Sequence, residues 1–394
     1  MTDSPPFVAI DVSAVHPIAG GGHTYAHLLT RYLPAQGIDP LCVTRSDGNS
    51  SEWDGCGVLP IAPTSRLARL VWEQTQLLRT LHDAGPAQGI SVLHSIHYTM
   101  PERPRLVDGL ARVVTIHDLT FFSRPQDHTQ AKRLFFRRAI SVAAQRADHL
   151  ICVSERTARE LLSTVKVSVP VEVIPHGIDR RRFAPDAPHA GDDAAVLAEL
   201  GIRAPFVLHL GTLEPRKNVG RLIEALAQVR SRAGNGGANR NAIRKSNAAH
   251  NAAHKDLSLV LAGGAWPGVR EALPTPDGLV IHHLGVVRDA HVPALLRRAE
   301  CVAYPSLAEG YGLPVIEALS CGASVVTSTG SVMEELAGEA AIYADPMSTD
   351  DLARALSSAL SGEGPDRSTR LAVAAQHDVH ESARRHAELY RRLA

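Results

Sequence analysis

The 394-residue chain lacks features that mark several large classes of protein. Its five cysteines form no Cys-x-x-Cys pair, which argues against a disulfide framework or a cysteine zinc site and fits a reducing compartment. No stretch approaches the roughly 18 apolar residues of a membrane-spanning helix. The N-terminal segment has no charged region or long apolar run, so we expect no signal peptide. Basic and acidic residues both number 41, so no basic field favours nucleic acid.

Several short motifs of phosphate and metal chemistry are also missing. The sequence contains no G-x-G-x-x-G and no G-x-x-x-x-G-K-[ST], which disfavours a dinucleotide fingerprint or a P-loop. It has no His-Glu-x-x-His and no Asp-x-Asp. We therefore expect no zinc site and no divalent metal that holds a nucleotide diphosphate.

Short apolar runs alternate with longer helical patterns along the first half of the chain. Runs that are apolar at nearly every position indicate strands buried on both faces, as in a parallel sheet. The alternation of strand and helix predicts an α/β fold with open, doubly wound sheets. The predicted strands are 7–12, 91–94, 112–116, 149–152 and 171–174, and the predicted helices are 23–33, 66–82, 130–147 and 155–162.

The same pattern restarts after a polar segment at 180–194, which we interpret as a hinge. Two similar halves that meet at a hinge are a simple geometry for a cleft enzyme. We predict an N-terminal domain at 1–185, a C-terminal domain at 186–375, and a final helix at 376–394 that packs back on the first domain. The predicted elements of the second half are strands 206–210, 257–262, 279–284, 300–303 and 323–327, and helices 219–230, 312–320 and 352–360.

The segment 232–255 is rich in Asn, Ala and Gly and has no apolar periodicity. This composition is typical of a flexible surface insertion. An arm that binds a partner or nucleic acid is the alternative.

A glycine cluster lies between the first strand and the first helix. Gly21 and Gly22 would let the backbone approach a ligand at a helix N-terminus, whose unpaired N–H groups favour anions. An ordinary strand-to-helix turn explains the same residues equally well.

Two cations follow the strand at 206–210. Arg216 and Lys217 lie at the carboxyl end of that predicted strand, where open parallel sheets place their ligands. Two adjacent cations suit a diphosphate. The alternative is a solvated charge pair at a helix start, although cations oppose the helix dipole there.

The stretch from Glu309 to Glu317 is the most informative part of the sequence. Glu309 lies in a loop, Glu317 lies within a predicted helix, and Gly310 and Gly312 let the loop turn toward a phosphate. One carboxylate could bind sugar hydroxyls and the other a ribose diol. A capping loop with a surface glutamate is the alternative.

His117 precedes Asp118 at the end of the strand at 112–116. A histidine there could be a polar group in a cleft whose charge responds to pH. A buried histidine with satisfied hydrogen bonds is an equal alternative.

Together these motifs resemble the retaining glycosyltransferases of family 4, whose GT-B fold consists of two facing Rossmann-like domains with an interdomain cleft. The strongest match is the pair Glu309 and Glu317 within the glycine-bearing stretch at 305–318, and the similarity spans nearly the whole chain. The stretches 211–218, 174–179 and 115–118 also match. Residues 72–74 and 93–95 look like those of bacterial polysaccharide mannosyltransferases.

The resemblance implies a role for each site residue. Glu309 would bind hydroxyls of the donor sugar, Glu317 would bind the nucleotide ribose, and His117 would lie near the donor sugar and the acceptor. Arg216 and Lys217 would hold the diphosphate. Backbone N–H groups would complete that cradle, from Gly21, Gly22, Gly310, Tyr311, Gly312 and Leu313.

The resemblance thus predicts a hexosyltransferase that moves a hexose with retention of configuration. We expect mannose from GDP-mannose as the donor and a saccharide or lipid-linked saccharide of surface polysaccharide synthesis as the acceptor. We expect no further cofactor, no required metal and no nucleic-acid partner. The alternatives are a UDP-sugar donor, a nucleotide-sugar epimerase or another GT-B enzyme such as a phosphorylase, and a non-catalytic sugar-binding protein.

We expect a cytoplasmic protein that contacts the inner face of the membrane weakly. Four cations surround three apolar residues on the helix at 130–147, and such a face could meet anionic headgroups. A core helix with a solvated rim is the alternative. The cations are Lys132, Arg133, Arg137 and Arg138, and the apolar residues are Leu134, Phe135 and Phe136.

Overall fold

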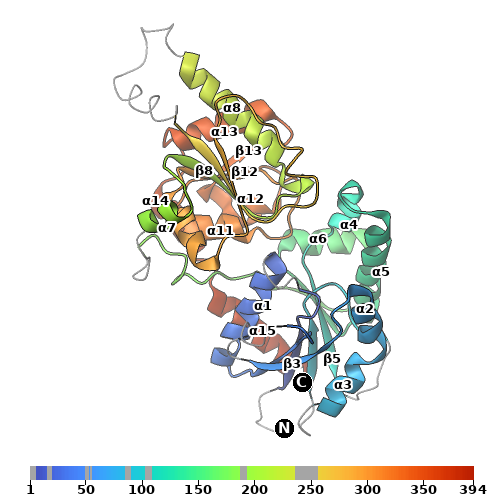
Figure 1. Cartoon of the computed structure of the whole chain (residues 1–394). Helices are drawn as coiled ribbons and strands as arrows, with labels where there is room; N and C mark the ends of the chain where they lie inside the picture. The colour runs from blue at the N-terminus through green and yellow to red at the C-terminus, as the bar shows by residue number, and fades with distance from the viewer. Residues whose placement is uncertain are drawn as a thin grey trace. The chain divides into compact units, whose positions relative to one another are not determined.

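The structure, a computed structural model, describes residues 6–15, 20–48, 53, 56–84, 90–102, 109–186, 193–235 and 256–394. Contacts divide the chain into an N-terminal unit, Met1–Gly177 with His377–Ala394, and a C-terminal unit, Ile178–Gln376 (Figure 1). The sequence places this division at 185 instead. Residues 178–185 join the C-terminal unit because Phe183 is buried and its carbonyl accepts a hydrogen bond from Ser320 Oγ at 2.5 Å.

The N-terminal unit contains a seven-stranded parallel sheet in the order β3-β2-β1-β4-β5-β6-β7. All five strands predicted in this half are present. Two further strands were not predicted, β2 and the edge strand β3. Strand β3 is mostly half-exposed and contains Pro60, a residue that edge strands tolerate. The strands are β1 (Val8–Asp11), β2 (Pro40–Arg45), β3 (Gly57–Ala62), β4 (Val92–Ser95), β5 (Ala111–Ile116), β6 (His149–Cys152) and β7 (Val171–Val173).

Helices cover both faces of this sheet. On β1, Val8 and Ile10 pack in a core with Tyr25, whereas Ala9 between them packs in a core with Trp72. This explains why the consecutive residues Val8, Ala9 and Ile10 are all apolar. The predicted helix at 66–82 is two helices that meet at Gln76. The helices are α1 (Gly21–Tyr32), α2 (Arg66–Thr75), α3 (Leu77–Ala84), α4 (Thr120–Ser123), α5 (Gln130–Arg146), α6 (Glu155–Thr164) and α15 (Val379–Leu393).

The last helix, α15, packs against α1 within the N-terminal unit (Figure 1). Its His386 Nε2 lies 2.8 Å from the hydroxyl of Tyr25, and its Tyr390 hydroxyl lies 2.7 Å from Nδ1 of His94. A Cβ on Gly177 would lie 2.2 Å from Cα of Val379, so only glycine permits this close approach. The chain therefore returns to its first unit after completing the second.

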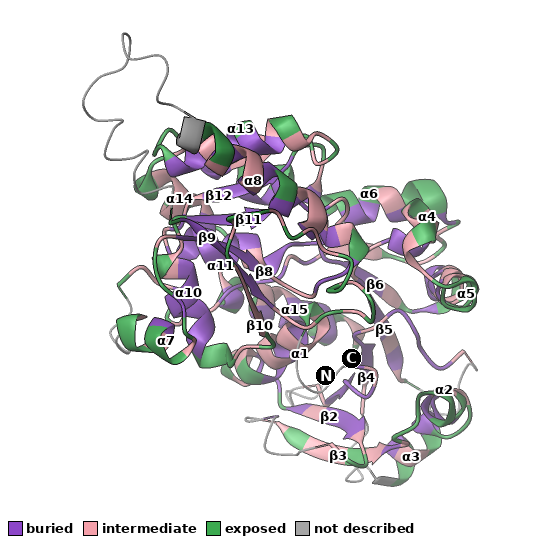
Figure 2. Cartoon of the chain, turned by 45° about the horizontal axis from the view of Figure 1, so that its top comes forward, coloured by how far each residue is buried: buried purple, intermediate pink, exposed green. Residues whose placement is uncertain are grey.

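The C-terminal unit contains a six-stranded parallel sheet in the order β10-β9-β8-β11-β12-β13. Its central strands are fully buried, and α8 and α13 lie side by side over one face (Figures 1 and 2). The strands are β8 (Phe206–Leu210), β9 (Ser258–Ala262), β10 (Ile281–Gly285), β11 (Cys301–Tyr304), β12 (Val325–Ser328) and β13 (Ile342–Ala344).

The helices of this unit include every one that the sequence predicts and several short ones that it does not. They are α7 (Asp193–Glu199), α8 (Val219–Asn235), α10 (Val292–Arg298), α11 (Leu313–Ser320), α12 (Val332–Ala337), α13 (Thr349–Leu360) and α14 (Arg367–Ala374). Helix α8 continues to Asn235, so the predicted flexible segment 232–255 begins in a helix. Its remainder, 236–255, lies outside the described residues.

Candidate active site

The strand order of the C-terminal sheet reverses between β8 and β11, so the loops that follow these two strands meet at one edge of the sheet. Such a reversal is where open α/β sheets bind ligands. The two loops are bonded to each other. Leu307 N–H donates to the carbonyl of Arg216 at 2.7 Å, and Asn218 Nδ2 donates to the carbonyl of Pro305 at 3.2 Å. These bonds fix the loop that carries Arg216 and Lys217 against the loop that carries Glu309.

Glu309 binds both predicted cations. Its Oε1 lies 2.5 Å from Lys217 Nζ and its Oε2 lies 2.7 Å from Arg216 Nη1. Arg216 also pairs with Glu214 at 2.6 Å, and Lys217 donates to the hydroxyl of Tyr304. The side chains of Lys217 and Glu309 are only 7% and 9% exposed. Arg216, Lys217 and Glu309, which were predicted from the sequence as site residues, therefore contact one another in the fold.

The charges of this cluster depend on one another. Burial alone would raise the pKa of the Glu309 carboxyl, but Lys217 and Arg216 lower that pKa to about 2. Burial lowers the pKa of Lys217, whereas Glu309 raises it. Glu309 is therefore a carboxylate at neutral pH, and it helps Lys217 to keep its proton.

Helix α11 begins directly after this loop. Gly312, the residue that caps it, has φ 111°, and a Cβ there would lie 2.3 Å from Cε of Met333, so this position requires glycine. Gly310, Tyr311 and Leu313 are buried beside it. The N-terminus of α11 thus directs its positive dipole toward the end of β11 that carries the cluster.

Glu317 lies one turn inside α11 and is 8% exposed. Burial raises the pKa of its carboxyl to about 7; Arg182 opposes that shift and Asp289 adds to it. Its carboxylate accepts no hydrogen bond from any residue that the structure describes. Such a buried carboxyl group retains its capacity to bind a polar ligand.

The other predicted site residues lie in the N-terminal unit. His117 Nε2 is 2.7 Å from the carbonyl oxygen of Ile96, which can only accept, so Nε2 carries the proton and Nδ1 is left as an acceptor. Burial lowers the pKa of His117, which keeps the ring neutral. Gly21 and Gly22 are the first residues of α1, and a Cβ on either would meet nothing within 4 Å.

Sequence reasoning missed two further groups of polar residues. The first is Tyr304. It ends an apolar strand, and nothing in the sequence indicates that its hydroxyl contacts Lys217. The second lies at the reversal between β1 and β4, where Glu73 accepts hydrogen bonds from Arg69 at 3.0 Å and Thr99 at 2.9 Å. Burial raises the pKa of Glu73 to about 7. Residues 72–74 were singled out only for their resemblance to polysaccharide mannosyltransferases, and the i,i+4 spacing of Arg69 and Glu73 on a helix was the further signal for this pair.

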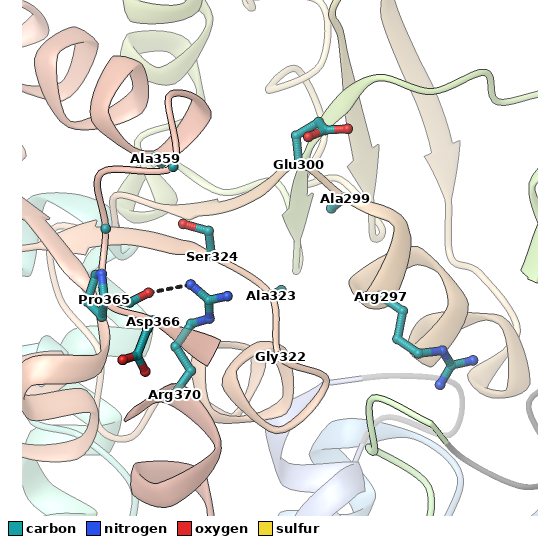
Figure 3. Close-up of a pocket in the computed structure, with 12 residues that line it drawn as sticks. Arg297, Ala299, Glu300, Gly322, Ala323, Ser324, Ala359, Pro365, Asp366 and Arg370 are labelled. Carbon is teal, nitrogen blue, oxygen red and sulfur yellow. Dashed lines mark hydrogen bonds between the residues drawn. The ribbon is translucent and has the colours of Figure 1, made fainter. Parts of the chain in front are cut away.

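A separate cavity of about 410 Å³ lies at the opposite end of the C-terminal sheet (Figure 3). It is lined by Glu300 and Ser324, which directly precede β11 and β12, so it opens at the amino ends of these strands. Its two arginines have partners, because Arg297 pairs with an aspartate and Arg370 donates to a carbonyl. We therefore place the candidate site at the carboxyl ends of the strands.

Two further properties concern metals and membranes. No three His, Cys, Asp or Glu side chains of the described ranges lie close enough together to hold a metal ion. Within those same ranges, every helix is too short or too polar to span a bilayer.

Family models match most of the chain. Residues 19–182 match Glycosyltransferase Family 4, and residues 198–378 match Glycosyl transferases group 1. A sucrose-phosphate synthase from Thermosynechococcus elongatus is similar in structure, with a TM-score of 0.72 and 20% identity over 98% of this chain and 99% of that one. HepE from Anabaena, solved with UDP and glucose, has a TM-score of 0.67 and 19% identity over 97% and 98%. The chain thus has the GT-B fold, and the family models of glycosyltransferases match both of its halves.

Curated relatives agree with this class. The O-antigen chain mannosyltransferase B of Escherichia coli is 26% identical over 66% of this chain and 62% of its own length. The MMP alpha-(1->4)-mannosyltransferase of Mycolicibacterium hassiacum is 26% identical over 54% and 45%, so the chain spans less than two thirds of either relative. The N-terminal part of the chain, 19–182, is thus a family 4 glycosyltransferase domain, and 198–378 is a group 1 glycosyl transferase domain.

Proposed function

We propose that the protein transfers mannose from GDP-mannose, with retention of configuration, to a saccharide or lipid-linked saccharide acceptor in surface polysaccharide synthesis. The observation that carries this proposal is the convergence of Arg216, Lys217 and Glu309 where the C-terminal sheet reverses its strand order. Two cations and a helix N-terminus are suited to a diphosphate leaving group, and a carboxylate beside them is suited to sugar hydroxyls.

In this proposal the enzyme accelerates transfer mainly by stabilising the charge of the leaving diphosphate. Negative charge grows on it as the glycosidic bond to the donor sugar breaks, and fixed cations stabilise that charge. Arg216 and Lys217 supply the cations, and backbone N–H groups of residues 310–313 add to the cradle. Glu317 binds the ribose. The acceptor hydroxyl enters on the face from which the nucleotide leaves.

The choice of mannose rests on the relatives, since mannosyltransferases from Escherichia coli and Mycolicibacterium hassiacum both match this chain. A UDP-hexose donor is the second candidate. It is favoured by the likeness of the whole chain to HepE, which was solved with UDP and glucose.

A donor panel tests the proposal. Purified protein is mixed with GDP-mannose, GDP, UDP-glucose, UDP-galactose, UDP-N-acetylglucosamine and UDP, and thermal unfolding is recorded for each. A ligand at 100 times its dissociation constant should add about 2.7 kcal/mol to the stability. GDP-mannose should give the largest shift, and mass spectrometry should then detect a hexose added to a lipid-linked saccharide. The absence of any shift with every nucleotide would contradict the proposal.

We also propose that the protein acts at the cytoplasmic face of the membrane, through α5. Leu134 and Phe135 are 65% and 37% exposed, whereas Phe136 is buried in the core. Exposed apolar residues among cations are suited to a surface of anionic lipid. Arg137 and Arg138 already have protein partners, so we expect only weak binding of this helix to the membrane surface.

Co-sedimentation with vesicles tests this contact. Binding should rise with the fraction of anionic lipid, fall with added salt, and weaken in a Leu134→Ser, Phe135→Ser double variant. Equal sedimentation with neutral and anionic vesicles would contradict it.

A further inference from the structure

The two cations of the candidate site already have anionic partners within the protein. Glu309 contacts both of them, through separate oxygens at 2.5 Å and 2.7 Å, in the manner of an anion held by two positive groups. We propose that Glu309 fills the position of the donor diphosphate until a nucleotide sugar displaces it. This inference rests on the proposed function and deepens it, because it assigns Glu309 a second role in the exchange of ligands.

The charges of the cluster require such an exchange. Arg216 and Lys217 contribute two positive charges, and Glu309 and Glu214 contribute two negative charges at contact distance. The cluster therefore has no net positive charge to offer a diphosphate. A carboxylate has to leave before an anion of that kind can bind there, because like charges at such distances repel strongly.

The cations have other contacts that keep them in place when Glu309 leaves. Arg216 Nη1 donates to the carbonyl of Ala308 at 2.9 Å, and a second nitrogen pairs with Glu214. Lys217 donates to the hydroxyl of Tyr304, a side chain that is fully buried. Glu309, in contrast, stands in the loop between β11 and α11, where a change of rotamer moves its carboxylate. Glu309 is thus the exchangeable member of the cluster.

The exchange distinguishes the donor from the nucleotide product. When a nucleotide sugar binds, the displaced carboxylate can accept hydrogen bonds from the sugar hydroxyls, which compensates for the lost ion pairs. A free nucleoside diphosphate offers no such hydroxyls. After transfer, Glu309 therefore returns to Arg216 and Lys217 and promotes release of the nucleotide.

The sign of one binding change tests this inference. The Glu309→Gln variant keeps the shape of the side chain but no longer competes with a diphosphate. Isothermal titration with GDP and with UDP should give at least about tenfold tighter binding to the variant than to the wild type, because a charge-assisted contact is no longer broken. Glu309→Asp, which cannot reach both cations as well, should give a smaller gain. The exposed Glu339→Gln change in the same unit is the matched control and should bind as the wild type does.

Proton uptake is the second readout. Glu309 raises the pKa of Lys217 against the effect of burial, so the variant should leave Lys217 more readily deprotonated. A bound diphosphate should raise the pKa of Lys217 in Glu309→Gln again, so proton uptake on binding should increase with the pH of the titration. The binding heat should depend on the ionisation enthalpy of the buffer more strongly than it does for the wild type. A purely structural role for Glu309 would not change this dependence.

The outcomes separate the inference from the function beneath it. If the folded wild type binds no nucleoside diphosphate at all, the proposed function is wrong and the inference falls with it. If the wild type binds but Glu309→Gln binds equally or more weakly, only the exchange is wrong. Thermal unfolding of each variant confirms that the folded protein is compared.

Discussion

Glu317 is the buried carboxyl group at which a change of pH should have the clearest effect on stability. Its pKa is raised to about 7 by burial, whereas an unfolded glutamate titrates at 4.5. The folded state therefore keeps its proton at pH values where the unfolded state has lost it. The contribution to stability is complete below pH 4.5 and declines as the pH rises through 7.

The magnitude follows from the size of this shift. A difference of 2.5 pH units, at about 1.4 kcal/mol for each, means that ionised Glu317 destabilises the folded state by about 3.5 kcal/mol at pH 8. Glu317→Gln removes the ionisation. The free energy of unfolding of this variant, relative to the wild type, should therefore rise by about 3 kcal/mol between pH 4.5 and pH 8.

Urea titrations of both proteins at pH 4.5, 6, 7 and 8 measure this difference. The exposed Glu339→Gln change is the control and should show no such dependence on pH. A difference between Glu317→Gln and the wild type that stays constant over this range would refute the reasoning. It would mean that Glu317 ionises in the folded protein at an ordinary pH.

Four other predictions concern the cations, metals, the last helix and the cysteines. Arg216→Ala and Lys217→Ala should each remove a contact to the diphosphate worth about 1.5–3 kcal/mol, and the loss should be larger in the transfer rate than in nucleotide affinity. Unchanged kinetics in both variants would favour a solvated charge pair. Transfer activity should persist in EDTA. If EDTA abolished the activity and magnesium restored it, the proposal that Arg216 and Lys217 bind the diphosphate without a metal would be wrong. His386, with a pKa lowered to about 4 by burial, contributes stability above pH 6.5 that is lost as the pH falls toward 4, so His386→Gln should unfold with a shallower dependence on pH in urea titrations. Cys42 and Cys56, whose sulfurs lie 2.8 Å apart, should be linked by hydrogen peroxide, and peptide mapping that finds both thiols reduced would contradict this.

The fold was largely predictable because its strands are buried on both faces. Runs such as 206–210 and 149–152 are apolar at all but one position, and each is an interior strand of its sheet. The edge strands β3 and β13 were missed because β3 contains Pro60, which argues against a strand, and β13 is only three residues long. The first break was placed eight residues late, since composition marks the polar segment but not the contact of Phe183 with Ser320.

The cation and carboxylate cluster was predictable because each member follows a strand of the C-terminal sheet. Spacing alone could not reveal that Glu309 contacts both Arg216 and Lys217, which depends on the adjacency of β8 and β11. Tyr304 was missed for the same reason. Its apolar neighbours in the strand indicate burial, but only the fold brings its hydroxyl to Lys217.

The transfer rate of Glu309→Ala tests the central claim most directly. Wild type and variant are incubated with GDP-mannose or another accepted nucleotide sugar and a lipid-linked saccharide, and the glycosylated product is quantified by mass spectrometry. Thermal unfolding verifies that the variant is folded, which we expect because Glu309 lies in a loop. The account predicts that transfer falls by orders of magnitude while binding of the nucleoside diphosphate survives. Transfer at the wild-type rate in the folded variant would contradict the assignment of the donor site.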